Sequence, residues 1–310
     1  MKRFKIFTVL IILIFIGGCG KKEPPTMGIG YSYLNRYDNC VDVICPEGSL
    51  YNCNTGDLED YDYNDGCVYF IKADNMYRAD ISNNALYPLL EENEFRRVCD
   101  EYCIRPIVSV GNSGKVAVQL YKRESNHSSI YIIDNGKMEY LCEVDGSGIN
   151  NNSSVNLNKV PFCADKSGEY LFVKQNNELV KFDIQNKAVT TLIADFKYDI
   201  FDVDASGEKA AYIYENNIYL YDISSGKETQ IGEMEFPVGK IKLSDDGSRI
   251  MVMDTTSKKG GLADYVPGPG MNVLYIYDCA NGKAQKIVEG GCGNVRGGFD
   301  FGPLSRFRTN

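Results

Sequence analysis

Tryptophan is absent from this sequence of 310 residues, and histidine occurs only once, as His127. A catalytic site of the Ser-His-Asp or Cys-His type would have to be built around that one residue, and no Gly-x-Ser-x-Gly motif accompanies it. Its neighbours in "SNHSS" are polar. We interpret His127 as a surface loop residue, and the scarcity of histidine argues against histidine-based catalysis.

Long apolar runs are also scarce. The N-terminus carries one at residues 6–16, shortly after Lys2, Arg3 and Lys5. This run is well short of the roughly 20 residues of a membrane-spanning helix, and a basic start followed by a short apolar segment is typical of a secretion signal. The sequence therefore predicts an exported protein with a signal peptide at residues 1–18.

The end of this apolar run resembles a bacterial lipobox. Ile16-Gly17-Gly18-Cys19 has the aliphatic residue, the two small residues and the cysteine of that motif. The resemblance implies that the Cys19 thiol receives diacylglycerol and that cleavage makes Cys19 the first residue of the mature chain. Acyl chains would then hold the protein on the extracytoplasmic face of the cell membrane. The alternative is an ordinary signal peptide with an accidental cysteine.

Residues 19–30 are mostly polar and contain two prolines, without any apolar period. Such a composition is typical of a short linker, so we expect a tether between the lipid and the folded part. The predicted organisation is a signal peptide at 1–18, a tether at 19–30 and one domain at 31–310.

Acidic residues outnumber basic ones by 42 to 33, and the formal net charge is -9. Residues 1–18 contribute three positive charges and no acid, so the chain without them carries -12. Nucleic-acid binding draws most of its affinity from lysine and arginine, which argues against a nucleic-acid partner. We attribute the excess acid to solubility rather than to the capture of cations or basic partners, and we expect no cofactor.

A phrase with a central glycine recurs along the chain. It reads "YNDGCVYF", "VGNSGKVAVQL", "ADKSGEYLFVK", "VDASGEKAAYIY" and "LSDDGSRIMVMD". The glycines are Gly66, Gly114, Gly168, Gly207 and Gly247, separated by 48, 54, 39 and 40 residues. Alternating apolar residues follow each glycine, which is the period of a β-strand. We expect a hairpin at each glycine, with a two-residue loop that favours a positive φ.

Each unit continues in the same way after this first hairpin. A second strand ends in aspartate, a turn such as "SSGK" or "ANGK" follows, and a closing strand such as "ETQIG" completes the unit. We interpret the terminal aspartates as acceptors of hydrogen bonds from turn amides, with a ring of metal-binding carboxylates as the alternative. They are Asp80, Asp134, Asp183, Asp222 and Asp278.

Such units predict an all-β fold, a β-propeller, because about four short strands recur at a regular period with almost no helical pattern between them. The phrases "LSDDGSRIMVMD" and "NIYLYDISSGK" resemble the TolB-type, WD-repeat-like propeller family over about residues 55–290. The proline of that family's turn and any tryptophan are missing. The resemblance implies a scaffold that mainly binds proteins or small ligands.

Five repeats leave the closure of the ring to be explained. Strand-like segments lie near both ends of the chain, as "GIGYSYL" and "CVDVIC" within residues 27–54 and "GGFDFG" close to the C-terminus. A blade completed by strands from both ends would pair edges that otherwise promote aggregation. We therefore predict six four-stranded blades, with five or seven as alternatives.

Two units contain insertions, and loops carry the function of many scaffolds. One insertion includes "YKRESNHSS", and the other is "DTTSKKGGLADYVPGPGM", between the second and third strands of its blade. We take residues 255–271 as the candidate binding loop, with a plain solvated insertion as the alternative. Its predicted contact residues are Lys258, Lys259, Asp264 and Tyr265.

Ten cysteines remain besides Cys19, and an even number in an exported chain is compatible with disulfides. Several lie in the N-terminal segment, whereas Cys99 and Cys103 flank a predicted loop before the second unit. Disulfides, free thiols and a metal cluster all remain open. The sequence lacks any Cys-x-x-Cys pair, so the cluster is the weakest of the three hypotheses.

The sequence thus favours a lipid-anchored binding or assembly module without catalysis, whose partner is an envelope protein or a glycan. The alternative is a hydrolase or lyase that acts on cell-surface polysaccharide through carboxylates, because paired acids catalyse such reactions without histidine. Two facing acids with perturbed pKa values in a central pocket would favour the enzyme. A structural spacer in an envelope complex is a further alternative. Many of the 22 tyrosines fall on strand positions and leave a carbohydrate-stacking surface open.

Overall fold

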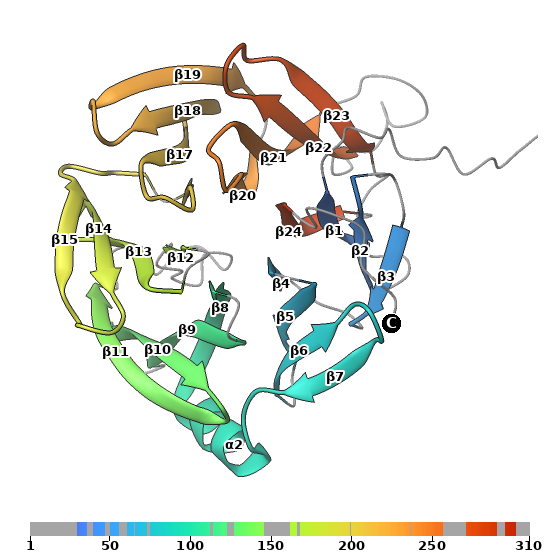
Figure 1. The fold of residues 1–310 in the computed structure, drawn as a ribbon, viewed down its shortest axis with the longest axis vertical. Helices are drawn as coiled ribbons and strands as arrows, with labels where there is room; N and C mark the ends of the chain where they lie inside the picture. The colour runs from blue at the N-terminus through green and yellow to red at the C-terminus, as the bar shows by residue number, and fades with distance from the viewer. Residues whose placement is uncertain are drawn as a thin grey trace, which may run out of the picture.

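The computed structural model describes residues 30–35, 40–46, 50–55, 61–64, 66–72, 75–111, 114–122, 127–145, 162–165, 168–198, 200–235, 237–256, 271–289 and 295–301. Of these, the backbone alone is described for residues 34, 35, 99–107, 121, 122, 127, 145, 237–239, 255, 256, 271, 272, 288, 289 and 295–300. The described chain forms six four-stranded antiparallel sheets around an axis (Figure 1). The predicted six-bladed propeller is therefore confirmed.

Each blade is a sheet whose four strands succeed one another from the axis outward. Blade 1 consists of β24 (Val295–Phe301), β1 (Tyr31–Asn35), β2 (Cys40–Ile44) and β3 (Leu50–Asn54). Blade 2 consists of β4 (Tyr61–Asn64), β5 (Cys67–Ile71), β6 (Met76–Asp80) and β7 (Ala85–Pro88). Blade 3 consists of β8 (Tyr102–Val110), β9 (Lys115–Lys122), β10 (His127–Asp134) and β11 (Lys137–Asp145).

The other three blades follow the same order. Blade 4 consists of β12 (Phe162–Ala164), β13 (Tyr170–Gln175), β14 (Glu178–Asp183) and β15 (Val189–Ile193). Blade 5 consists of β16 (Phe201–Val203), β17 (Lys209–Tyr214), β18 (Asn217–Asp222) and β19 (Lys227–Glu233). Blade 6 consists of β20 (Pro237–Leu243), β21 (Arg249–Thr256), β22 (Met271–Asp278) and β23 (Ala284–Glu289). Blades 2 to 6 each contain one of the five repeats.

Blade 1 closes the ring with strands from both ends of the chain, as predicted. β24 pairs antiparallel with β1, so that Tyr31 lies opposite Phe301 and Ser32 opposite Asp300. The innermost strands then contact one another in the order β4, β8, β12, β16, β20, β24 and again β4. The ring is thus continuous at the axis, and each end of the chain supplies part of one sheet.

The core lies between the blades rather than within a single layer. Each sheet has a neighbouring blade on both of its faces, and one apolar cluster fills each of the six gaps between neighbouring sheets. In the gap between blades 4 and 5, for example, Phe172 and Tyr212 are each 1% exposed. The other five clusters include Phe70, Val118, Val173, Val252 and Leu274.

The repeated glycines adopt the predicted left-handed conformation, with φ of 76° at Gly66 and 73° at Gly207. The predicted two-residue loop is found only at Gly66, where Asn64 pairs with Cys67. It is wrong for blades 3 to 6, in which longer loops join the first and second strands. In blade 5 the loop starts at Asp204, which is 4% exposed and accepts hydrogen bonds from the backbone N–H groups of Glu208 and Lys209. A buried acceptor at this position stabilises the longer turn.

The five aspartates of the sequence repeat end the third strand of each of blades 2 to 6. They accept hydrogen bonds from the turns, as expected. Asp222 accepts the backbone N–H of Ser225 at 2.8 Å, and this bond, with the Ser224 and Ser225 hydroxyls, lowers the pKa of Asp222 to about 2. Asp134 differs from the others, since it accepts the side-chain amide of Asn135 and pairs with Lys115. Corresponding backbone bonds are made by Asp80, Asp183 and Asp278.

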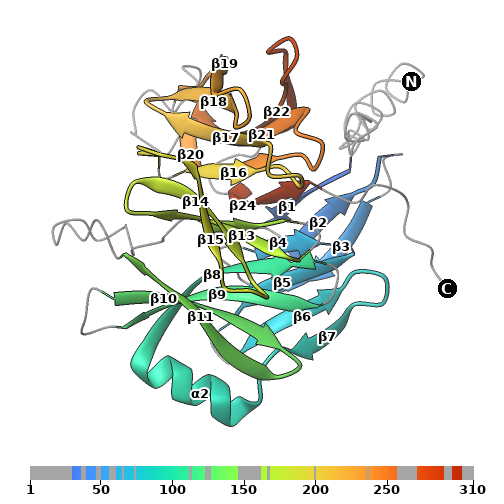
Figure 2. The ribbon, with the colours of Figure 1, turned by 60° about the vertical axis from the view of Figure 1, so that its left-hand side comes forward.

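One helix, α2 (Glu92–Glu101), lies between blades 2 and 3 on the outer rim (Figure 2). Its buried Phe95 and Val98 pack against the cluster between these two blades. The predicted loop before the second unit is therefore wrong, because Cys99 belongs to α2 and Cys103 to β8. The sequence signal was weak, since two apolar residues among charged ones define only one turn of a helical face.

The insertion that contains His127 also differs from its prediction. The backbone of His127 forms the first residue of β10, opposite Asp145 of β11, rather than part of a loop. The ladder between β10 and β11 continues to this pair because β11 is long enough to supply a partner for each residue at the start of β10. Among the described residues, no helix has the length and apolar composition needed to cross a bilayer.

Candidate functional site

The innermost strands place polar side chains at one common position. Asp62, Cys163, Asp202 and Lys242 occur in β4, β12, β16 and β20 and lie opposite Tyr69, Phe172, Ala211 and Met251 of the second strands. These four partners occupy equivalent positions in their blades, because each stands two residues after the start of the second strand. The same register therefore brings side chains from four blades toward the axis.

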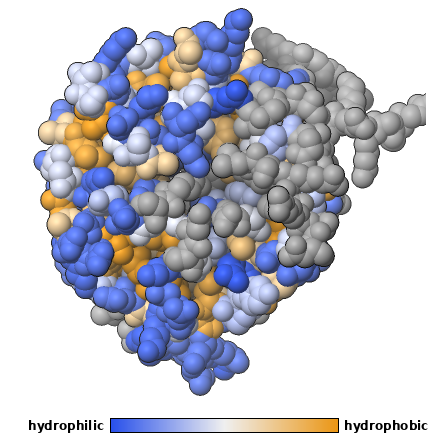
Figure 3. Space-filling view, in the orientation of Figure 1, coloured by the Kyte–Doolittle hydropathy of each residue, from blue (hydrophilic) through white to orange (hydrophobic). Residues whose placement is uncertain are grey.

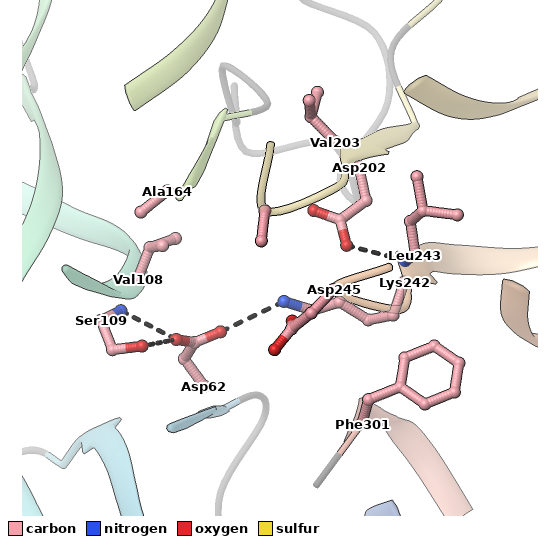
Figure 4. Close-up of a pocket in the computed structure, with 11 residues that line it drawn as sticks. Asp62, Val108, Ser109, Ala164, Asp202, Val203, Lys242, Leu243, Asp245 and Phe301 are labelled. Atoms are coloured by element: carbon pink, nitrogen blue, oxygen red, sulfur yellow. Dashed lines mark hydrogen bonds and ion pairs between the residues drawn. The ribbon is translucent and has the colours of Figure 1, made fainter. Parts of the chain in front are cut away.

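Asp62 is the centre of a buried network at the axis (Figure 4). It is 5% exposed, and its Oδ2 accepts the backbone N–H of Ser109 at 2.8 Å and also the Ser109 hydroxyl. Its Oδ1 lies 3.2 Å from the Lys242 ammonium, with side chains 7% and 15% exposed. The Asp62 network thus joins blades 2, 3 and 6, and both carboxylate oxygens are engaged.

Asp202 is the second acid at the axis. It is 7% exposed, and its Oδ2 accepts the backbone N–H of Leu243 at 2.8 Å, which joins blade 5 to blade 6. The Cys163 thiol of blade 4 lies beside it. Burial holds the pKa of Cys163 well above its ordinary value, and the charge of Asp202 raises it further. This thiol therefore stays protonated, and a nucleophilic thiolate is not available there.

A small cavity remains between these side chains. Its volume is about 30 Å³, and its lining includes Asp62, Ser109, Asp202, Lys242 and Phe301. All six blades contribute to it, with Ala164 from blade 4. A cavity of this size has room for water molecules but not for a substrate. Within the described part of the chain, the axis is thus lined by polar side chains that contact one another between the blades.

A larger recess, which we term the interblade groove, lies away from the axis between blades 3 and 4. Its volume is about 740 Å³. Blade 3 contributes residues of β10 and β11 together with Lys115, and blade 4 contributes residues 168–170 and 183–187 from its two turns. On the face of the molecule shown in Figure 3, hydrophilic residues lie along most of the outline, and apolar surface shows between them. The interblade groove lies where two neighbouring blades diverge.

Ion pairs organise the walls of the interblade groove. Lys115 lies 3.1 Å from Asp134 within blade 3, and Lys187 of blade 4 lies 3.3 Å from Glu139 of blade 3. The second pair therefore links the two walls. Asp183 accepts the backbone and side-chain N–H groups of Asn186, and these bonds lower its pKa. Asp183 is therefore held in its ionised form by the turn that it closes.

The residues predicted as functional lie outside the described part of the chain. They are Cys19 and the candidate binding-loop residues Lys258, Lys259, Asp264 and Tyr265. The flanking strands β21 and β22 are the second and third strands of blade 6, in agreement with the predicted position of the insertion. Within the described residues, no group of three or more histidine, cysteine or acidic side chains could hold a metal ion.

No protein-family model and no curated protein matches this chain. Solved structures are similar to it. For TolB from Acinetobacter baumannii, the TM-score is 0.59 at 13% identity, over 88% of this chain and 66% of that chain. For a chain of a nidogen/laminin complex, the TM-score is 0.59 at 8% identity, over 89% of this chain and 99% of the other. For a putative TolB from Agrobacterium tumefaciens, it is 0.55 at 12% identity, over 88% and 98%.

The fold is a TolB-like β-propeller. At these identities the likeness establishes the fold alone, and the chain spans about two thirds of the length of the Acinetobacter baumannii TolB chain. Sequence reasoning identified the TolB-like repeat but missed the axial residues. A signal was present on the short inner strands, which read "YDY", "FCA", "FDV" and "IKL". In each of them a charged residue or a cysteine stands between two aromatic or aliphatic residues. These residues precede the repeated glycine, whereas the regular alternation that marks the repeat follows it.

Proposed function

We propose that this TolB-like propeller is a lipid-anchored, extracytoplasmic binding or assembly module that does not catalyse a reaction. The observation that carries the proposal is the commitment of Asp62 and Asp202 at the axis to contacts within the chain. Asp62 is engaged by Ser109 and Lys242, and Asp202 accepts the Leu243 N–H. A general acid or a nucleophile has to reach its substrate, and the axial cavity that the described residues form, of about 30 Å³, admits only water.

The interblade groove supports the binding role. Its volume of about 740 Å³ lies within the range of roughly 300–1,000 Å³ that is usual for ligand sites. Its walls come from rigid strand ends and short turns, which present side chains with little conformational freedom. One of the similar structures was determined as a nidogen/laminin complex, and this use of the shared architecture agrees with a binding module.

Attachment at Cys19 is the part of the proposal that the lipobox resemblance supports. β1 begins at Tyr31, so roughly a dozen residues separate the lipid from the first strand. We expect the wild-type chain to incorporate labelled palmitate and to remain with membranes, and C19A to do neither, because acyl chains supply the affinity for the bilayer. An unlabelled wild-type chain that is released into the medium would contradict the anchor.

Binding through the groove can be tested with a photo-crosslinking amino acid in the full chain on cells. Lys137, at the groove, and Lys227, on the outer strand of blade 5, are both exposed and provide a matched pair of positions. We expect a specific adduct from position 137 and none from position 227. The enzyme hypothesis is tested in parallel: breakdown of envelope polysaccharide by the wild-type chain, lost in D62N or D202N, would overturn the proposal.

A further inference from the structure

We infer that the interblade groove binds a neutral oligosaccharide of a few residues. This inference rests on the proposed function and specifies its ligand class. The groove opens between two blades, and its lining combines an apolar floor, two tyrosines and charged groups, four of which form two ion pairs. Each of these features matches one part of the chemistry of a sugar ring.

The two tyrosines stand on different walls. Tyr140 of β11 is 45% exposed, and its ring meets Tyr131 edge-on, at 5.6 Å between centroids and 80° between planes. Tyr170 of β13 lines the other wall, and one face of its ring is already occupied by the Lys181 ammonium, 3.5 Å from the ring centre. Aromatic faces carry partial negative charge and attract the polarised C–H groups of a sugar. The contact with Tyr131 holds Tyr140 in place, so that stacking costs little side-chain entropy.

The floor of the groove is apolar. Ile132 and Leu141 are 8% and 6% exposed, and Ile184 of blade 4 is half-buried beside them. The rim above them is polar, with carboxylates, amides and ammonium groups from both blades. A sugar ring has an apolar face and a hydroxylated edge, so it can cover the floor and hydrogen-bond to the rim at the same time.

The charges favour a neutral ligand. Three lysines and four acids line the groove, which leaves a formal net charge of only -1. Lys115 is paired with Asp134 and Lys187 with Glu139, so a charged ligand that meets either pair would have to break it or approach a like charge. A hydroxyl group both donates and accepts, and it can bond to a carboxylate and an ammonium without disturbing the pair.

Calorimetry on the full chain in detergent tests the inference. The probes are the neutral trisaccharides maltotriose, cellotriose and chitotriose, with trigalacturonate as a charged comparison. We expect at least one neutral trisaccharide to bind and trigalacturonate to bind more weakly. Y140A should weaken binding about tenfold, which corresponds to about 1.4 kcal/mol. Y140F keeps the ring and should retain binding.

Tyr214 provides the matched control. It is 48% exposed, lies outside the groove lining and also meets a tyrosine edge-on, with Tyr198 at 5.5 Å. We expect Y214A to bind as the wild-type chain does. Equal losses in Y140A and Y214A, failure of all three neutral probes to bind, or tighter binding of trigalacturonate would each overturn the inference, as would a peptide as the only adduct at position 137.

Mass spectrometry of the probes separates this inference from the proposed function. Intact trisaccharide that binds supports both. Trisaccharide that is cleaved would overturn the non-catalytic function, whereas intact trisaccharide that does not bind overturns the ligand class alone.

Discussion

The axial ion pair between Asp62 and Lys242 allows a quantitative test of the fold. Removing one partner of a buried ion pair costs about 3–5 kcal/mol of unfolding free energy, because the other charge stays buried without compensation. In D62N the amide oxygen can still accept from Ser109, so the loss is mainly that of the charge 3.2 Å from Lys242. The Lys242 side chain is 15% exposed and Asp202 lines the same cavity, so we expect the lower end, about 3 kcal/mol.

A second substitution tests the cause of this loss. K242M removes the ammonium that has lost the charge of Asp62, so D62N/K242M should be about 2 kcal/mol more stable than D62N alone. D195N provides a surface control, because Asp195 and Lys197 form a pair with side chains 74% and 68% exposed, and such pairs contribute below about 1 kcal/mol. Urea unfolding at pH 7 followed by circular dichroism measures all four chains. A D62N midpoint equal to that of the wild-type chain, or a double variant no more stable than D62N, would refute the reasoning.

Two further predictions concern the turns. Because the pKa of Asp222 is lowered to about 2, its contribution to stability is present above the ordinary aspartate pKa of 3.8 and is lost as the pH falls through about 2. The thermal midpoint of the wild-type chain should therefore exceed that of D222N at pH 5 and approach it at pH 2, and a constant difference would count against this. At Gly282, with φ of 67°, an added Cβ would lie 2.8 Å from the Ile231 backbone oxygen, whereas at Gly136, with φ of 77°, it would meet nothing within 4 Å. We expect G136A to cost about 1 kcal/mol in urea unfolding and G282A clearly more, and equal losses would show that the close approach is unimportant.

Much of the fold could be predicted from the sequence because the repeats are local signals. Alternation after Gly207 and the aspartate at 222 mark hairpins whose partners lie only a few residues away. The closing blade was also predictable, since an incomplete ring leaves one sheet short of strands. The length of the loops could not be predicted, because glycine has a positive φ in two-residue loops and in longer ones alike. The length depends on the register in which the next strand pairs.

The candidate site was harder to predict. Lys187 and Glu139 are 48 residues apart and meet only because blades 3 and 4 are neighbours in space. Asp62 and Lys242 are separated by 180 residues, and their pairing depends on the curvature of the whole ring. The sequence therefore favoured the insertion at residues 255–271 as the binding site. The composition of a loop can be read from adjacent residues, whereas the meeting of distant side chains at the axis cannot.

The pairing of β1 with β24 has a consequence for biogenesis. Tyr31 lies opposite Phe301, so the circular arrangement cannot be completed until residue 301 has been synthesised. Until then β1 has an open hydrogen-bonding edge, and contacts over such sequence distances form slowly. Loss of a few residues that include β24 would leave that edge permanently open, so proteolysis at the C-terminal strand should damage the protein far more than its length suggests.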